Sequence, residues 1–583
     1  MKKFKLKIAA FLLCMGTLVS CEDYLQVNPV SSFGPDFVFS NVGTATQAIT
    51  GVYAPLGGDN GYGIRLSMYY AVSDDILMGQ AGNPFPDNER RDIAQFTVQP
   101  SNTQLRLPFN QLYLGIERAN ICIAEIPRMN MFENGTASER AALRRLYGEA
   151  LALRAQFYFE LIRNWGDIPA QFEPSSAQPD LFLERTDRDI IYDRIIEDLA
   201  EAAELVPWGT PGGNNERLTQ GAIRALRARI ALFRGGYSLR LDRQMRRGAD
   251  HIRFYQIAKE ETERIIQSGS HGLHPDYEEL WKTLLANRKD PAGEFMWEVA
   301  MTGGTNQFGD SKLGFYNGPR WNNIGNSALT LLPTFFYAFD ERDTRRDVSA
   351  APYNIEREGT LIARPLHQML DGKFRRDWIT PSTFGSVAQY FNINWPVIRY
   401  SDVLLMFAEA ENELNNGPTP AAIAAFEEVR LRAFKGDRSL IGATPTDYQG
   451  FFNALVDERA FELVGEGIRK YDLIRWNMLG QKLQESREKL TRMFNREGEY
   501  ANLPTTMFFE PGQTTINWMN SLTQPQPSPA PAGSASVAWV GNGINTGILN
   551  FYAVGFEPNK NELLPLHTSV LDANPRLRQE YGY

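Results

Sequence analysis

The sequence predicts a mainly α-helical fold, organised as one large domain behind a short export signal. Several long segments repeat apolar residues at the three- and four-residue spacing of an amphipathic helix. Such segments follow one another in pairs, at 143–205 and 398–434, which is typical of tetratricopeptide-like repeats. Hydrophobic residues make up 43% of the 583 residues and charged residues 22%, a composition typical of a globular protein.

The beginning of the chain has the pattern of a secretory signal. Four lysines precede the apolar run 8–19, which at twelve residues is too short for a membrane-spanning helix. Small residues and then Cys21 follow, as in a lipoprotein signal whose cleavage leaves this cysteine to be acylated. We therefore expect a signal peptide at 1–20, a lipidated tether at 21–44 and the helical domain at 45–583. An ordinary signal peptide with a coincidental cysteine is the alternative.

Helical periodicity is strongest in the middle of the domain. The longest stretch, 138–164, keeps its apolar residues on one face and ends at Gly166 and Pro169, which are typical helix stops. Three stretches lack the periodicity and are rich in glycine, proline and aromatic residues, so we expect loop-rich insertions there: 57–108, 281–391 and 495–560. The other predicted helices are 45–54, 112–126, 188–205, 219–235, 255–267, 398–415, 420–434 and 448–464.

Charge and cysteine content argue against two classes of protein. The net charge is -9, and it becomes more negative once the signal lysines are removed, which argues against binding to nucleic acid. Cys14 leaves with the signal and Cys21 is acylated, so Cys122 stands alone and no disulfide framework can form. Cys122 lies in an apolar run, where we expect it to be buried.

The sequence contains no recognisable catalytic motif. Its five histidines do not form the His-Glu-x-x-His zinc motif, and neither a Gly-x-Ser-x-Gly elbow nor a phosphate-binding loop is present. His271 and His274 stand near acidic residues, but a solvated loop is a simpler interpretation than a metal site. Asp74 and Asp75 are neighbouring acids of the kind a glycosidase uses, among many accidental pairs. We expect neither an enzyme nor a cofactor.

Five segments of the chain are similar to one family pattern, that of the SusD/RagB-like nutrient-binding outer-membrane lipoproteins. Their order and spacing span nearly the whole mature chain, and the lipoprotein signal strengthens the resemblance. The segments are LALRAQFYFELIRNWGDIP at 151–169, LTQGAIRALRARIALF at 218–233, WPVIRYSDVLLMFAEAENEL at 395–414, VDERAFELVGEGIRKYDLIRW at 456–476 and NPRLRQEYGY at 574–583.

The resemblance implies a single SusD-like domain with four tetratricopeptide-like helix pairs and a loop-rich ligand-binding face. Such proteins cover a SusC-like TonB-dependent transporter in the outer membrane, face the exterior and deliver an oligosaccharide, or in some members a peptide, to it. Glu22 and Asp23 resemble the acidic signal that sends such lipoproteins to the cell surface. The alternatives are a lipoprotein glycosidase and a tetratricopeptide adaptor that binds no small ligand.

Two loop regions combine the residue types that bind sugars, namely flat aromatic rings beside planar polar side chains. The first is 308–323 and the second is 74–91, and the resemblance implies that the ligand site is assembled from these same regions. Packing beneath long loops is the alternative for Tyr316 and Trp321. The predicted ligand-binding residues are Phe308, Tyr316, Arg320, Trp321, Asn322 and Asn323 in the first region, and Asp75, Asn83 and Phe85 in the second.

Other conspicuous residues are expected to be structural. Arg154 lies on the apolar face of its helix, where a guanidinium group must be satisfied by carboxylates or carbonyls. Trp281 and Trp476 lie on helical patterns and are predicted core residues. The candidate partners of Arg154 are Glu409, Glu411 and Glu462.

Overall fold

The structure is a computed structural model of the chain, and it describes residues 34–79, 85–304 and 306–583. The predicted signal peptide, the predicted lipidation site Cys21 and the predicted ligand residue Asn83 lie outside the described residues. Within them, no helix is long and apolar enough to cross a membrane.

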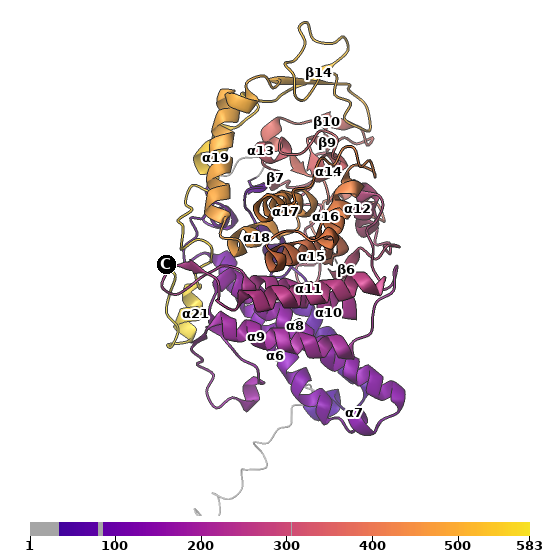
Figure 1. Cartoon of the computed structure of the whole chain (residues 1–583), viewed down its shortest axis with the longest axis vertical. Helices are drawn as coiled ribbons and strands as arrows, with labels where there is room; N and C mark the ends of the chain where they lie inside the picture. The colour runs from indigo at the N-terminus through magenta and orange to yellow at the C-terminus, as the bar shows by residue number, and fades with distance from the viewer. Residues whose placement is uncertain (1–33, 80–84, 305) are drawn as a thin grey trace, which may run out of the picture.

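Long helices form the frame, and the predicted mainly α-helical fold is confirmed. Each packs against its neighbours in the series, so the frame grows by stacking of helix pairs, and Figure 1 shows α9, α11 and α15 one above the other. The helices of the frame are α4 (Val42–Tyr53), α6 (Thr103–Glu125), α8 (Ala137–Trp165), α9 (Arg188–Leu205), α10 (Gln220–Gly235), α11 (His251–Ser268), α15 (Tyr400–Asn415), α16 (Pro420–Ala433) and α17 (Tyr448–Leu463).

The central helix α8 has clear start and stop signals. Thr136 accepts a hydrogen bond from the backbone of Glu139, whose side chain accepts one from Thr136 in return, forming a capping box. The helix ends at Gly166, whose φ of 76° suits glycine. Between these ends α8 packs against α4, α6 and α9. Because neighbours cover most of its sides, nearly all its residues from 148 onward are buried.

The helix α6 begins earlier than predicted and includes Pro108, which we expected to end a loop. Proline cannot donate the usual helical hydrogen bond to the carbonyl four residues earlier. That carbonyl, of Gln104, instead accepts a hydrogen bond from the Tyr70 hydroxyl at 2.6 Å. Asn102 caps the new start through the backbone of Gln104. A tertiary contact that no local pattern reveals therefore extends this helix.

The predicted loop-rich stretches contain short strands and helices. An antiparallel sheet has the order β1-β7-β11-β8, and β6 pairs with β12 through an irregular register. The strands are β1 (Ile76–Met78), β2 (Ile168–Pro169), β3 (Arg185–Thr186), β4 (Ser238–Leu239), β5 (Met245–Arg246), β6 (Phe295–Val299), β7 (Leu329–Leu331), β8 (Ala350–Ala351), β9 (Tyr353–Ile355), β10 (Leu361–Ala363), β11 (Leu370–Asp371), β12 (Trp395–Arg399), β13 (Thr506–Phe509) and β14 (Ala535–Ala538).

One long helix was not predicted, although its pattern is visible in the sequence. In α19 (Leu479–Asn495) the buried positions Leu483, Leu490 and Met493 follow helical spacing among charged residues. The remaining helices are short: α3 (Pro35–Val38), α5 (Arg90–Ala94), α7 (Asn130–Asn134), α12 (Tyr277–Leu285), α13 (Pro333–Phe336), α14 (Thr344–Ser349), α18 (Arg469–Arg475), α20 (Thr546–Phe551) and α21 (Thr568–Ala573).

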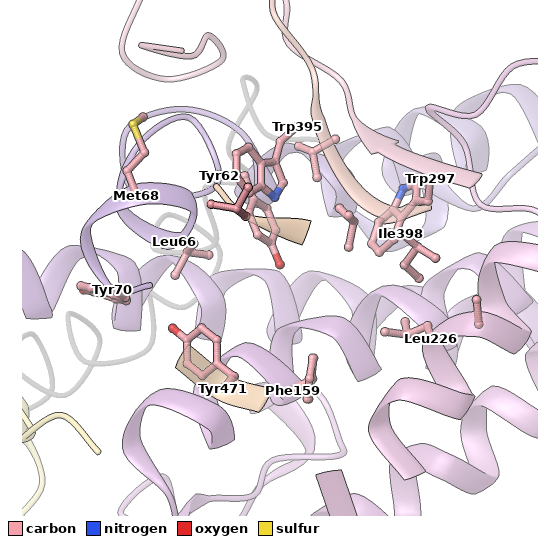
Figure 2. Packing of buried hydrophobic residues seen from close by; sticks show 14 of the residues in the cluster. Tyr62, Leu66, Met68, Tyr70, Phe159, Leu226, Trp297, Trp395, Ile398 and Tyr471 are labelled. Atoms are coloured by element: carbon pink, nitrogen blue, oxygen red, sulfur yellow. The ribbon is translucent and has the colours of Figure 1, made fainter. Parts of the chain in front are cut away.

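The core confirms the burial of Trp281, Trp476 and Cys122. Burial raises the pKa of the Cys122 thiol to about 12, so it is a buried apolar group and not a nucleophile. The core also reaches under the loops. Figure 2 shows Tyr62 beside Trp395, and the two rings stack with centroids 6.2 Å apart.

Arg154 is buried at 1% exposure, as predicted, but its expected partners were wrong. Its guanidinium group contacts Asp198 of α9 at 2.5 Å and donates to Asn120 and to the Phe172 carbonyl. The carboxylates nominated from the later helices lie elsewhere, because the packing of α8 against α9 decides which acid faces the arginine. Glu409 pairs with Arg475, Glu411 with Lys259, and Glu462 with Arg345, Arg399 and Arg432.

The C-terminal segment closes over the start of the frame. The Tyr581 hydroxyl accepts hydrogen bonds from the backbone of Asp167 and from the guanidinium of Arg188. The backbone of Leu564 donates to Asn164, and the Trp165 indole donates to Pro565. Residues about 400 apart in sequence are thereby joined at the end of α8. In Figure 1 the C-terminus accordingly lies at the left side of the molecule, above α21.

Candidate functional site

The two predicted loop regions meet at Tyr316. The guanidinium carbon of Arg90, from the second region (74–91), lies 5.4 Å from the centroid of the Tyr316 ring, which belongs to the first. The Lys312 ammonium lies at the same distance from this ring. Both distances are within the range of cation–π attraction. The two insertions therefore form one surface, as the resemblance implies.

Lys312 extends this surface to Asp59 and Tyr390. The Lys312 ammonium contacts the Asp59 carboxylate at 3.2 Å, and the Tyr390 hydroxyl donates to the same carboxylate at 3.0 Å. The ammonium also lies 4.8 Å from the centroid of the Tyr390 ring. We call Asp59, Arg90, Lys312, Tyr316 and Tyr390 the Tyr316 cluster.

The charges of the Tyr316 cluster are partly shielded from water. Burial alone would lower the pKa of the Lys312 ammonium, but the hydrogen bond with Tyr390 and the charge of Asp59 raise it above its ordinary value. Lys312 therefore stays charged at neutral pH. Oδ1 of Asp59 is buried and accepts no hydrogen bond from any described residue. Buried acceptors of this kind are usually satisfied by an ordered water or a ligand.

The frame positions the Tyr316 cluster through the loop that carries Asp59. Tyr62, three residues later, stacks on Trp395 of β12, and its hydroxyl accepts a hydrogen bond from Gln156 of α8 at 2.7 Å. At Gly58 the φ is 71°, and a Cβ there would lie 2.5 Å from the Phe308 carbonyl. Only glycine fits this close approach of two backbones.

Arg90 is positioned by its own loop. Asp87 accepts hydrogen bonds from the backbone of Glu89 and Arg91, and its carboxylate lies 3.8 Å from the Arg90 guanidinium. Tyr69 also interacts with Arg90 and raises the pKa of this guanidinium group against the effect of burial. The cation is therefore anchored on one side and faces Tyr316 on the other.

Trp321, Asn322 and Asn323 form a tight turn beside this surface. The backbone groups of Trp321 and Ile324 exchange hydrogen bonds at 3.1 and 3.0 Å, and both asparagines have positive φ, as a two-residue hairpin turn requires. The asparagine side chains are exposed. The Trp321 ring is half-buried with its centroid 5.1 Å from that of Phe384. Arg320, just before the turn, is also half-buried.

Three predicted ligand residues, Asp75, Phe85 and Phe308, do not join this surface. Asp75 is only 2% exposed and accepts a hydrogen bond from Ser73 at 2.9 Å, because it directly precedes the buried strand β1. Burial raises its pKa to about 6. Asp75 thus lies in the core, away from the surface around Tyr316, and its assignment as a ligand residue stays a prediction. Phe85 is exposed, but its ring contacts Phe551 of α20, with centroids 5.3 Å apart.

Phe308 is 78% exposed and lines a separate cavity of about 550 Å3, which we call the Phe308 pocket. Its other walls are Ile49 and Tyr53 of α4, Leu56, Val299 of β6, and the adjacent residues Glu216 and Arg217. A further cavity of about 740 Å3 lies between α12, α14 and α16, and no predicted ligand residue lines it.

Asp59, Lys312 and Tyr390 were missed as site residues. Asp59 stands in the glycine-rich run GGDNGYG, a sign of a tight loop, and Lys312 precedes Gly314, Phe315 and Tyr316. These are weak signals for a site. The pairing of the three depends on contacts between residues more than 250 apart, which no local pattern reveals.

The described residues hold no cluster of three or more histidine, cysteine or acidic side chains that suits a metal ion. His274 uses Nδ1 in contacts with the backbone of Asp276. His271 contacts the Gly293 carbonyl at 2.9 Å. Both rings therefore serve loop structure in this part of the chain.

Comparisons with known proteins identify the class to which this frame and surface belong. The chain matches the model of the SusD family over residues 372–583 and a model described as starch-binding, associating with outer membrane, over residues 23–232. It is 26% identical to SusD-like protein P25 of Formosa agariphila, over 82% of this chain and 91% of that protein. It is 25% identical to SusD-like protein P2 of the same organism, with the same coverage.

Solved structures share the fold. A SusD homolog from Bacteroides thetaiotaomicron has a TM-score of 0.75 at 22% identity, with coverage of 94% of this chain and 98% of that one. Surface glycan-binding protein A from the same organism, in complex with laminarihexaose, has a TM-score of 0.63 at 17% identity, with coverage of 92% and 99%. The two family models together span more than half of the sequence, and the chain belongs to the SusD/RagB-like family.

Proposed function

We propose that this protein binds oligosaccharides at the outer membrane and delivers them to a SusC-like TonB-dependent transporter. The single observation that carries the proposal is the Tyr316 cluster, where the two loop-rich insertions 57–108 and 281–391 combine two aromatic rings, two cations and a carboxylate. Aromatic rings pack against the apolar faces of sugars, while charged groups hydrogen-bond their hydroxyls. The unpaired Oδ1 of Asp59 supports a polar ligand at this position.

The family relationships support a glycan as the ligand. A related structure is described as a laminarin-binding SusD-like protein, and another was solved with laminarihexaose. A peptide is the alternative ligand. No catalytic step is part of the proposal, so the bound glycan is released unchanged. Incubation with the bound oligosaccharide should yield no new reducing ends, and their appearance would favour a glycosidase.

A glycan and peptide array followed by calorimetry tests the proposed site. Tyr316→Ala removes the ring that faces Arg90 and Lys312, and we expect it to weaken glycan binding at least tenfold. Tyr147→Ala, which removes a half-buried tyrosine of α8, is the matched control and should leave the affinity unchanged. Equal affinity of the Tyr316 variant and the wild type would contradict this site, and binding of peptides alone would contradict the glycan.

Anchoring and partnership form the second part of the proposal. Acylation of Cys21 would tether the protein to the outer membrane and place it on the exterior beside the transporter. Cys21→Ala should shift the protein from the membrane fraction to the soluble fraction. Purification of the wild type from solubilised outer membranes should bring along a barrel of transporter size, and its repeated absence would contradict the partnership.

A further inference from the structure

A single short segment of the chain connects the Phe308 pocket with the Tyr316 cluster. The backbone N–H of Asp59 donates to the carbonyl of Gln307 at 2.9 Å, while the Asp59 carboxylate belongs to the cluster. Lys312 is the fourth residue after Phe308, so their Cα atoms lie at most about 14 Å apart. A short oligosaccharide is long enough to contact both places.

Phe308 is held in its exposed position. The carboxylate of Asp310, which is buried, accepts hydrogen bonds from the backbone of Gly303 and Asn306 at 2.6 and 2.8 Å. Asn306 in turn accepts from the backbone of Phe308 at 2.9 Å. Single exposed apolar side chains are common on protein surfaces. This one differs because a hydrogen bond to Asn306 holds the backbone of Phe308 and the residue lines an apolar cavity.

The pocket combines an apolar floor with two charged residues. Ile49, Leu56 and Val299 are buried and form the floor. Glu216 and Arg217 also line the pocket and are half-buried; Glu216 accepts a hydrogen bond from Asn394, and Arg217 pairs with Glu149. A cavity with an apolar base, two aromatic residues in its walls and a few polar groups suits a ligand with an apolar face and hydroxyls at its edge. A sugar ring has this form.

We propose that the Phe308 pocket is a second carbohydrate subsite, which binds one end of an oligosaccharide whose other part lies on the Tyr316 cluster. The inference rests on the proposed function, because the occupant is the far end of the same glycan. The continuity through Asp59 and the segment 307–312 favours this occupant over an unrelated molecule. The pocket makes affinity depend on the length of the glycan.

Calorimetry with two chain lengths tests the subsite. The probes are laminaritriose and laminarihexaose, or the matching pair of whichever linkage the array identifies. We expect Phe308→Ala to lower affinity for the hexasaccharide about tenfold and to change affinity for the trisaccharide less than twofold. Tyr316→Ala should weaken both probes. Phe182→Ala, which removes another exposed phenylalanine, is the control and should change neither.

The outcomes separate the two proposals. If Tyr316→Ala weakens binding but Phe308→Ala leaves the hexasaccharide affinity unchanged, or weakens both lengths equally, the second subsite is wrong and the proposed function stands. If the wild type binds no glycan, both fail. If Phe308→Ala leaves glycan binding intact but abolishes co-purification of the transporter, the pocket belongs to a protein interface and the subsite is likewise overturned.

Discussion

Lys470 of α18 buries an ammonium group that forms no ion pair among the described residues, at an exposed fraction of 3%. It donates to the Tyr70 carbonyl at 2.9 Å, and burial, together with the charge of Arg163, lowers its pKa to about 8. The unfolded chain has the higher ordinary pKa, near 10.5. At neutral pH the charged Lys470 therefore destabilises the folded state, and this destabilisation disappears as the pH rises from about 8 to 10.5.

We expect Lys470→Met to raise the free energy of unfolding at pH 7 by about 1–3 kcal/mol, because a methionine avoids the cost of burying the charge. The gain should shrink by pH 10. Urea unfolding at both pH values measures it, with Lys435→Met, at an exposed position, as the control. A difference that does not depend on pH would contradict the explanation.

Glu298 of β6 has the opposite pH dependence. Burial raises its pKa to about 7, although hydrogen bonds from Asn394 and Asn215 oppose the shift. Because the folded pKa lies above the unfolded value of 4.5, the contribution of Glu298 to stability is complete below pH 4.5 and is lost as the pH rises through 7.

Glu298→Gln should therefore gain stability relative to the wild type as the pH rises. We expect the difference in free energy of unfolding, variant minus wild type, to be about 2–3 kcal/mol larger at pH 8 than at pH 5. Thermal unfolding at the two pH values checks this, and parallel profiles would exclude it.

At the scale of elements, the close contact of α6 with α8 depends on Gly115. A Cβ at this position would lie 2.4 Å from the Phe157 ring. Gly115→Ala should lower the free energy of unfolding by about 1–3 kcal/mol, because the helices must separate or the ring must move. The matched control is Gly51→Ala in α4, where no atom lies within 4 Å and alanine is the better helix former. The two variants should change stability in opposite directions in denaturant unfolding.

At the scale of the whole molecule, Glu462 joins three distant elements. Its carboxylate, which is fully buried, pairs with Arg345 of α14, Arg399 of β12 and Arg432 of α16. Burial alone would raise its pKa, but the three guanidinium groups hold the pKa well below its usual value. Its contribution is therefore present above the unfolded pKa of 4.5 and declines as the pH falls below it.

Glu462→Gln leaves three buried cations without their common anion. We expect the free energy of unfolding at pH 7 to fall by about 3–5 kcal/mol. Glu497→Gln, at an exposed position, serves as the control and should change stability by less than about 0.5 kcal/mol. Circular dichroism during urea unfolding measures both. Equal stability of the two variants would contradict a central role for Glu462.

The frame was predictable because helical periodicity is local. The spacing of apolar residues located α8, α9 and α10 almost to the residue, and the same spacing was present in α19, where it was overlooked. The start of α6 was not predictable, because it depends on the Tyr70 hydroxyl reaching the Gln104 carbonyl from a distant loop.

The candidate site was predictable only in part. Residue types in two loops pointed to the region around Tyr316, and the structure brings these loops together. Local sequence could not show that Asp75 turns inward at the edge of β1, nor that Asp59 pairs with Lys312. Both facts depend on how the insertions fold back onto the frame. The same limitation explains why the acid beside Arg154 was misassigned.

The hydroxyl of Tyr581 ties the last few residues to the junction after α8, and this has a practical consequence for anyone who wishes to produce the protein. A purification tag fused directly after Tyr583, or removal of the final three residues, would disturb the turn at Gly166 on which the central helix ends. Acylation at Cys21 would rule out a tag at the opposite end. An affinity tag is better inserted in the exposed proline-rich stretch 524–534, far from either anchor point in sequence.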